Sequence, residues 1–160
     1  MDYRDYLLAA YQQEHPASSD EFLAAIKNIM GEGTLYDLHC RMCKKYGPPK
    51  LGTSRVAYLS KSVVFKVPVT DDGFRHNDWE GSLVSLGGVE GDPYFIPIAR
   101  SRLHPRTDII IVVMEKVEEV DLDEIKTRLG HLPDFVSAVD MGQVGFTRKG
   151  KLVAFDYADL

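Results

Sequence analysis

The stretch LGTSRVAYLSKSVVFKVPV, from Leu51 to Val69, is where the hydrophobic pattern of the chain changes from helical to strand periodicity. Its first part places Gly52 in a turn before a run of β-forming residues, which predicts one strand. Its second part, SVVFKVPV, predicts another strand with a single charged side chain, Lys66, at its centre. We expect both strands to lie in an antiparallel sheet, because a short turn joins them.

Lys66 is unusual because the residues around it are Val, Phe and Pro. If its face of the strand is buried, the ammonium group needs a counter-charge. Glu80 is the candidate, in a helix that we expect over residues 75–86. The alternative is an edge strand, from which the stem of Lys66 covers apolar surface while its ammonium group reaches water.

The segment before this stretch, residues 1–49, carries three apolar stripes at helical spacing, which predict three helices. Ser18 followed by Glu21 fits a capping box at the start of the second helix, and Gly31 supplies its end. Thr34 is expected to cap the third helix, which ends before a Pro-Pro pair. The stripes predict that these helices pack on the sheet.

The segment after Pro49, residues 50–160, predicts two strands, one main helix, two more strands, short helical links and a final hairpin with TRKGK as its turn. We therefore expect an α+β protein, in which a helical amino-terminal segment packs on an antiparallel sheet. The two segments together are expected to form one compact domain.

The composition is that of an ordinary globular protein, with 160 residues, of which 44% are hydrophobic and 27% charged. The net charge of −5 argues against direct nucleic-acid binding, since such surfaces are usually basic. No apolar run reaches the roughly 18 residues of a membrane span. The amino terminus does not resemble a signal peptide, so we expect a cytoplasmic protein.

The two cysteines, Cys40 and Cys43, form one CxxC within the third predicted helix. No second pair completes a set of four zinc ligands, and His39 is adjacent rather than suitably spaced. We expect two helix cysteines, one of them partly buried, and the alternative is a metal or redox role. Their small number fits a reducing cytosol.

From Leu51 to Leu160, the order of these features resembles the protein kinase fold, chiefly its small lobe. In that family a glycine-rich turn covers the phosphates of ATP, a strand Lys contacts them and pairs with a helix Glu, and a late hairpin ends in a metal-binding Asp. The similarity is greatest to the early protein kinase of tailed phages, which also has a helical segment before its glycine turn. The matching residues are Gly52, Lys66, Glu80 and Asp156, with VVMEKVEEV (residues 112–120) as the hinge.

The resemblance implies bound ATP and magnesium. Lys66 would hold phosphate, Glu80 would position Lys66, and Arg55 would add positive charge to a phosphate, because the turn has one glycine where the family has up to three. Gln143 and Asp156 would hold the magnesium ion. Read without the family, Asp156 is a polar residue that caps a turn.

The catalytic loop departs from the family, which places an Asp base five residues before a metal-binding Asn. In one alignment Gln143 replaces the Asn and Ala138 replaces the Asp. In the other, Asp140 is the base, but the loop is about two residues short. Because the base must orient the attacking hydroxyl, both alignments argue against efficient phosphoryl transfer.

These departures, and a sequence that ends four residues after Asp156 without an activation segment or helical lobe, predict a degenerate kinase-like protein. We expect it to bind and modulate or inhibit a protein partner, such as a host enzyme or defence system met by a phage protein. The acidic stretch from Glu115 to Glu124 would suit a basic partner, for instance a nucleic-acid-handling enzyme, or is a solvated linker and helix start.

Two other functions remain open from the sequence. One is a minimal ATP- and magnesium-dependent protein kinase with Asp140 as its base. The other is a nucleotide-binding adaptor without chemistry. A metabolic enzyme of another fold is disfavoured, because the sequence has no serine-nucleophile elbow, no second metal-ligand pair and no dinucleotide GxGxxG.

Overall fold

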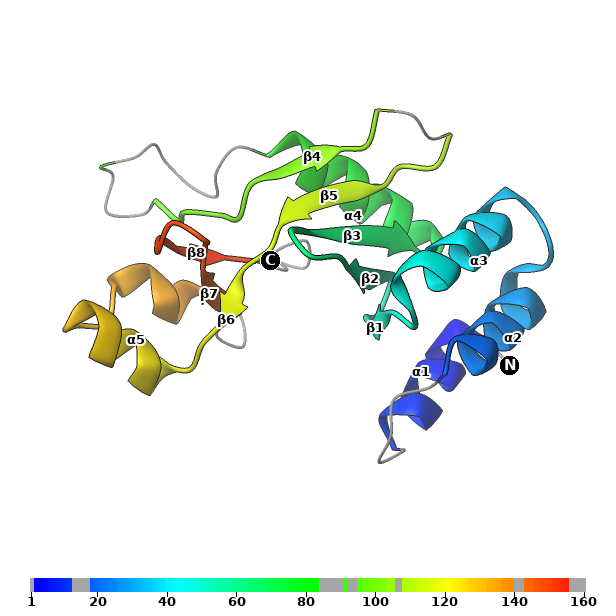
Figure 1. Cartoon of the computed structure of the whole chain (residues 1–160), viewed down its shortest axis with the longest axis horizontal. Helices are drawn as coiled ribbons and strands as arrows, with labels where there is room; N and C mark the ends of the chain where they lie inside the picture. Colours follow the sequence, from blue (N-terminus) through cyan, green and yellow to red (C-terminus); the bar gives the residue numbers. More distant parts are fainter. Residues whose placement is uncertain are drawn as a thin grey trace.

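The computed structural model describes residues 2–12, 18–83, 91, 95–105, 108–139 and 143–155. Asp140 and Asp156 therefore lie outside the described residues. The described elements, in chain order, are α1 (Tyr3–Tyr11), α2 (Ser19–Met30), α3 (Thr34–Tyr46), β1 (Lys50–Leu51), β2 (Arg55–Leu59), β3 (Val63–Pro68), α4 (Asp71–Ser82), β4 (Ser101–Leu103), β5 (Val112–Glu115), β6 (Glu118–Glu119), α5 (Leu122–Leu129), the 3-10 helix η1 (Asp134–Ala138), β7 (Val144–Phe146) and β8 (Leu152–Ala154) (Figure 1).

The larger sheet has five antiparallel strands in the order β1-β2-β3-β5-β4, which confirms the α+β prediction. Lys66 lies in the central strand, opposite Ala57 of β2 and Val112 of β5. The edge-strand alternative for Lys66 is therefore wrong, because a neighbouring strand pairs on each side of it. The predicted final hairpin is present as β7 and β8, which form a smaller antiparallel sheet with β6.

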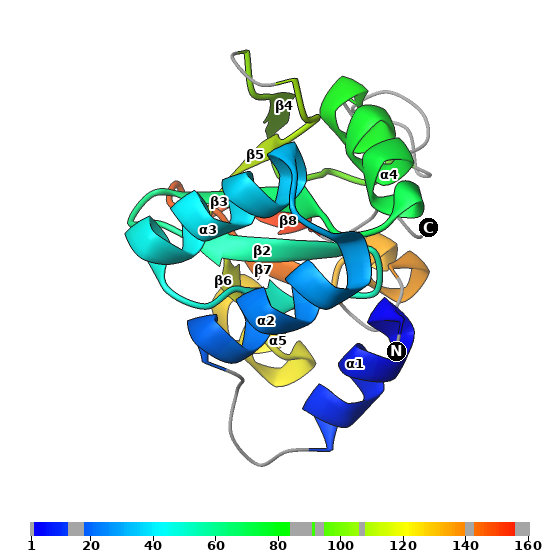
Figure 2. The ribbon, with the colours of Figure 1, turned by 90° about the vertical axis from the view of Figure 1, so that its right-hand side faces the viewer.

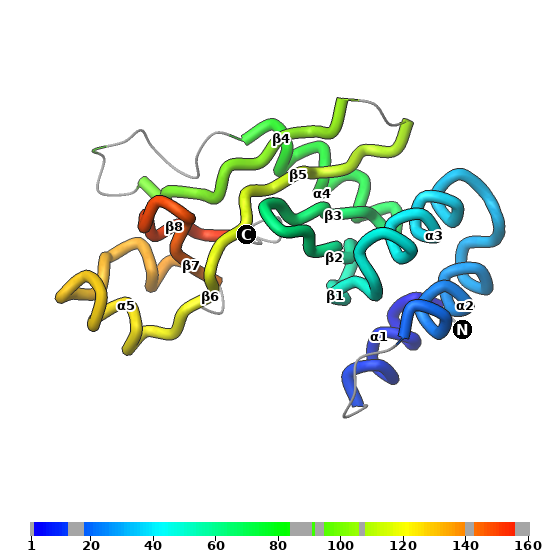
Figure 3. The backbone as a smooth tube through the Cα atoms, in the orientation of Figure 1, coloured from blue at the N-terminus to red at the C-terminus, as the bar shows by residue number. Residues whose placement is uncertain are grey.

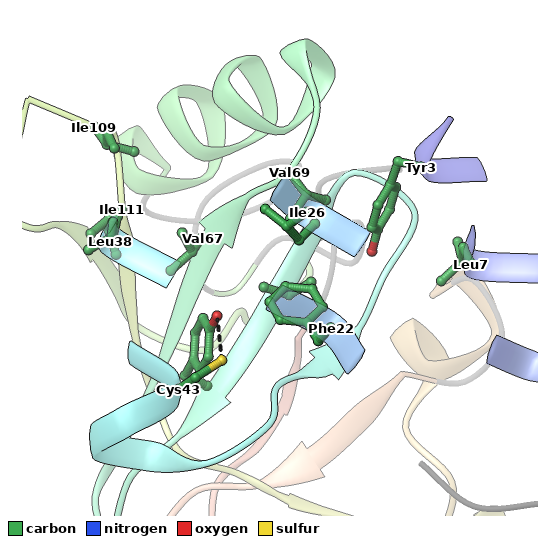
Figure 4. Close-up of a cluster of buried hydrophobic side chains, with 12 residues drawn as sticks. Tyr3, Leu7, Phe22, Ile26, Leu38, Cys43, Val67, Val69, Ile109 and Ile111 are labelled. Atoms are coloured by element: carbon green, nitrogen blue, oxygen red, sulfur yellow. Dashed lines mark hydrogen bonds between the residues drawn. The ribbon is translucent and has the colours of Figure 1, made fainter. Parts of the chain in front are cut away.

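The helices α2 and α3 pack on one face of the larger sheet, and α1 packs against α2 and bonds to the edge of the sheet at Leu51 and Gly52 (Figure 2). Phe22 and Ile26, on the inner side of α2, are fully buried and belong to the same core cluster as Tyr58 of β2 and Val67 of β3 (Figure 4). The apolar stripes read from the sequence are thus packing surfaces. Side chains alternate along a strand, so Lys66 and its neighbours at alternate positions face the opposite side of the sheet.

The smaller sheet packs with α5 and η1 at the opposite end of the molecule from α1 and α2 (Figure 3). Its last strand, β8, bonds to the segment before β4: Ala99 N–H donates to the carbonyl of Ala154, and Ala154 N–H donates to the carbonyl of Pro97, each at 2.8 Å. Val153 of β8 also shares a buried cluster with Val64 and Met114 of the larger sheet. The face of the larger sheet that carries Lys66 therefore looks toward the carboxyl-terminal hairpin.

Two predicted helix boundaries are wrong. The main helix begins at Asp71 and ends at Ser82, rather than spanning residues 75–86. Thr70 caps it by accepting a hydrogen bond from the Gly73 backbone at 3.3 Å, and acidic residues favour a helix amino terminus, so the segment DDG continues the helix instead of forming a turn. Thr34 is already in the first turn of α3, since Asp37 N–H bonds to the carbonyl of the preceding glycine.

Other expectations are confirmed. Ser18 caps α2 by accepting from the Glu21 backbone at 3.2 Å, which is one of the two bonds of the predicted capping box, and Gly31 ends the helix with a φ of 76°. Cys40 is partly buried and Cys43 is buried, both as free thiols on α3. No helix within the described ranges is both long and apolar enough to cross a membrane.

Candidate functional site

The site is built around Glu80, whose carboxylate is fully buried and lies between two cations. Glu80 Oε1 is 2.5 Å from Lys66 Nζ, and Glu80 Oε2 accepts a hydrogen bond from Arg55. Burial on its own raises the pKa of the carboxyl, but the charges and hydrogen bonds of Lys66 and Arg55 outweigh it and lower the pKa below the ordinary value. Glu80 is therefore ionised, and its charge fixes both cations at the centre of the sheet.

Asn77 lies one turn before Glu80 on the same face of α4 and is also fully buried. Its side-chain oxygen accepts from Arg55 at 3.1 Å, and its side-chain nitrogen donates to the carbonyls of Lys66 at 2.9 Å and Ile110 at 2.6 Å. The amide thus ties α4 to β2, β3 and the segment before β5. It sets the distance between the helix that carries Glu80 and the strand that carries Lys66.

A cavity of about 580 Å³ lies on the face of the sheet that carries Lys66. Apolar side chains from four different strands or strand ends line much of it: Ala57, Val64, Met114 and Phe155. Arg55, Lys66 and Gln143 line the cavity together with the glycine turn. The cavity therefore combines an apolar slot with a cationic region.

The glycine turn at residues 52–54 borders this cavity. A Cβ added to Gly52 would lie 2.6 Å from the carbonyl oxygen of Arg55, so the turn is too tight for a side chain there. Ser54 holds the far end of the turn, because its carbonyl accepts from Val69 N–H at 2.9 Å and its hydroxyl lies 2.8 Å from His76 Nδ1. The turn is a fixed wall of the cavity.

Five of the seven predicted site residues are brought together. Four of them form one cluster at and behind the cavity wall: Gly52, Arg55, Lys66 and Glu80. Gln143 lines the same cavity from the carboxyl-terminal hairpin, where its carbonyl accepts from Phe155 N–H at 3.0 Å. Asp140 and Asp156 lie outside the described residues, although Phe155, directly before Asp156, is part of the lining.

Three residues of the site were not predicted from the sequence: Asn77, His76 and Tyr11. Tyr11 lines the cavity from α1. Asn77 carried a signal, because it lies three residues before Glu80 and shares its helix face. No local pattern pointed to Tyr11, because its bond to the Leu51 carbonyl joins residues 40 positions apart in the chain.

Comparisons with known protein families, curated proteins and solved structures find no match for this chain. What the cavity binds therefore has to follow from its own chemistry.

The described residues test the predicted magnesium site only in part. Magnesium prefers oxygen ligands, usually including one or two carboxylates. Among the two predicted ligands, only Gln143, a neutral amide residue, is described, and it lines the cavity. No group of three or more His, Cys, Asp and Glu side chains that could hold a metal occurs in the described ranges. The described residues therefore provide no metal-ligand cluster, and the predicted ligand Asp156 lies outside them.

Proposed function

We propose that the chain is a kinase-like protein whose cavity binds a purine nucleoside triphosphate, and that it acts by binding and modulating a partner protein rather than by transferring phosphate. The observation that carries the proposal is the buried pair of Lys66 and Glu80 at the wall of an apolar cavity, beside a tight glycine turn. Protein kinases use this Lys–Glu pair to hold the nucleotide phosphates.

The size and chemistry of the cavity support a nucleotide. A volume of about 580 Å³ is within the usual range for small-molecule sites, which are mostly apolar with a few placed polar groups. Ala57, Val64 and Met114 would offer apolar contacts to a flat heterocycle. Arg55 and Lys66 both line the cavity, and their positive charges suit phosphate oxygens.

Weak or absent phosphoryl transfer follows from the catalytic loop. When Gln143 is aligned with the metal-binding Asn, the position of the base is Ala138, an exposed residue at the end of η1. A methyl side chain accepts no proton, so it orients no attacking hydroxyl. The nucleotide would then act as a ligand that stabilises the fold and the surface seen by a partner.

The proposed partner is a basic protein in the cytoplasm that docks on the acidic stretch from Glu115 to Glu124. In the free chain several of these acids already have intramolecular partners. Arg128 bonds Glu118 at 2.7 Å and Glu124 at 2.8 Å, and Lys50 bonds Glu119 at 3.1 Å. These pairs are largely exposed and each contributes little stability, so a partner's cations can replace them at small cost.

Calorimetric titration of ATP, with and without magnesium, tests the nucleotide site. We expect the wild type to bind ATP, and Lys66→Met to weaken binding by at least about tenfold. Lys61→Met, an exposed lysine in the turn before β3, is the matched control and should bind like the wild type. Loss of the magnesium dependence in Asp156→Ala would support the role of Asp156. A folded wild type that binds no ATP at millimolar concentration rejects the proposal.

A minimal, divergent protein kinase is the second candidate, favoured by the assembled pair of Lys66 and Glu80. Labelled ATP, magnesium and a mixture of acceptor proteins test it. Phosphate incorporation that is lost in both Lys66→Met and Asp140→Asn would establish the kinase. If the wild type incorporates no more phosphate than Lys66→Met, the kinase is rejected and the binding function is retained.

A further inference from the structure

Two tyrosines of α1 hold the start of the glycine turn and the β1 residue directly before it. The Tyr3 hydroxyl donates to the carbonyl of Gly52 at 2.7 Å, and the Tyr11 hydroxyl donates to the carbonyl of Leu51 at 3.3 Å. Tyr3 is 4% exposed and its burial raises the pKa of the phenol, so it remains a donor. Tyr11 is 62% exposed and lines the mouth of the cavity.

These two bonds complement the contacts at the other end of the turn. There Ser54 is held by the backbone after β3 and by His76 of α4. The carbonyls of Leu51 and Gly52 are held by α1, two turns of helix apart along its axis. The position of the turn over the cavity is thus set jointly by α1 and α4.

The helix α1 has few buried groups with which to anchor itself. Among its nine residues only Tyr3 and Leu7 are buried, while Leu8 and Tyr11 are exposed. The hydroxyl of Tyr6 is buried without a hydrogen-bond partner in the described structure, so it adds no polar attachment. A helix with so little buried apolar surface opens at low free energy, which makes its bonds to the turn responsive to what the turn contacts.

We infer that α1 is a latch on the glycine turn, and that Tyr3 and Tyr11 are positioning residues for the phosphate end of the nucleotide. This inference rests on the proposed nucleotide site. With α1 docked, the backbone of the turn is held in place over Arg55 and Lys66. By reciprocity, a bound triphosphate that favours the ordered turn also favours docking of α1 by the same factor.

Hydrogen exchange without nucleotide tests the latch itself. Tyr3→Phe removes only the hydroxyl, and Tyr6→Phe is the matched control, because it removes a hydroxyl from the same helix that makes no bond. We expect exchange in a peptide covering residues 51–56 to be about two- to tenfold faster in Tyr3→Phe, and unchanged in Tyr6→Phe. Equal rates in the wild type and Tyr3→Phe would overturn the latch.

Comparison of ATP with adenosine in the full chain tests the positioning role. Tyr3→Phe should weaken the binding of ATP by about two- to tenfold more than the binding of adenosine, because the turn would contact the phosphates and not the base. An equal loss for both ligands would mean a general structural effect and would overturn the positioning role. If the wild type binds neither ligand, the nucleotide site fails, whereas the exchange result still decides whether α1 holds the turn.

Discussion

His39 shows how one buried side chain acquires a role that its sequence neighbours do not suggest. It is 0% exposed, with Nδ1 2.7 Å from the Tyr58 hydroxyl and Nε2 3.0 Å from the carbonyl of Pro68. A carbonyl only accepts, so Nε2 carries the proton and Nδ1 accepts from Tyr58. The imidazole therefore joins α3 to β2 and β3 in its neutral form. His39 stands next to Cys40 in the sequence, where it was considered as a metal ligand, but in the fold it is a core residue.

The first prediction is an acid-sensitive stability that comes from His39. Burial lowers the pKa of His39 from 6.5 to about 4. The folded pKa lies below the unfolded one, so the contribution of His39 is complete above pH 6.5 and is lost as the pH falls toward 4. The full loss is about 3 kcal/mol.

Urea unfolding at about pH 7.5 and about pH 5 measures this contribution. The difference in unfolding free energy between the two pH values should be roughly 2 kcal/mol smaller in His39→Gln than in the wild type. His131→Gln, at an exposed position, is the control and should keep the wild-type pH dependence. A pH dependence that His39→Gln leaves unaltered would contradict the assignment.

The second prediction is that the loss of Glu80 destabilises the buried ion cluster more than the loss of Lys66 does. Glu80→Gln leaves two buried cations without their shared carboxylate, so we expect a loss of about 3–5 kcal/mol in unfolding free energy. Lys66→Met should cost less, because Glu80 keeps its bond to Arg55. Glu119→Gln, which removes an exposed pair with Lys50, should cost under about 1 kcal/mol. Urea unfolding ranks the three, and a Lys66→Met cost above that of Glu80→Gln would refute the shared carboxylate.

At the scale of elements, α4 decides the geometry of the site. Its three buried positions, Gly73, Asn77 and Glu80, recur at helical spacing and form the face that meets the strands. Gly73 allows the closest approach, since a Cβ there would lie 2.2 Å from the carbonyl oxygen of Ser54 and 2.9 Å from Pro68 Cβ. The glycine therefore brings α4 against the end of the glycine turn and places Glu80 beside Lys66.

The third prediction is that Gly73→Ala destabilises the protein although alanine is the better helix former. The added methyl overlaps backbone and a proline ring, neither of which is flexible, so we expect a cost of about 1–3 kcal/mol. Asp78→Ala, on the exposed side of the same helix, should change the unfolding free energy by less than about 0.5 kcal/mol. Thermal unfolding of both variants would compare them, and a stabilised Gly73→Ala would disprove the close packing.

At the scale of the whole molecule, the two sheets share one buried cluster. Val153 of the hairpin packs with Val64, Val112 and Met114 of the larger sheet. Backbone bonds between Ala154 and the segment before β4 add to this junction. The cavity lies beside this junction, because it is lined by Lys66 of the larger sheet and by Gln143, the residue directly before β7.

The fourth prediction is a single cooperative unfolding transition for the two sheets. The fluorescence of the one tryptophan, Trp79, reports on α4, which packs on the larger sheet, whereas far-ultraviolet circular dichroism reports on all elements. The two melting curves should coincide in the wild type, and Val153→Ala should lower both midpoints equally. Separate midpoints for the two signals would show that the sheets unfold independently.

Several parts of the site were accessible from local patterns. Lys66 stood out because a charge interrupts an apolar strand, and Glu80 because it lies in the next helix with the opposite charge. The start of α4 was misplaced, since acidic turn residues and helix-capping residues have similar compositions. Asn77 and the bond from Arg55 to Glu80 were not predicted, because polar side chains in a short window do not reveal which of them will be buried.

Periodicity alone was enough for the helical amino-terminal segment, the strand stretch from Leu51 to Val69, and the closing hairpin, because each pattern depends on neighbours within one or two turns. The face of the sheet that the helices cover depends on contacts between residues tens of positions apart. So do the meeting of Gln143 and the glycine turn at one cavity and the bonds from Tyr3 and Tyr11. Such contacts depend on the packing of whole elements, where burial and charge pairing among distant groups select one arrangement. The residue types at the candidate site could therefore be read from the sequence, but their relative positions are decided by the tertiary structure.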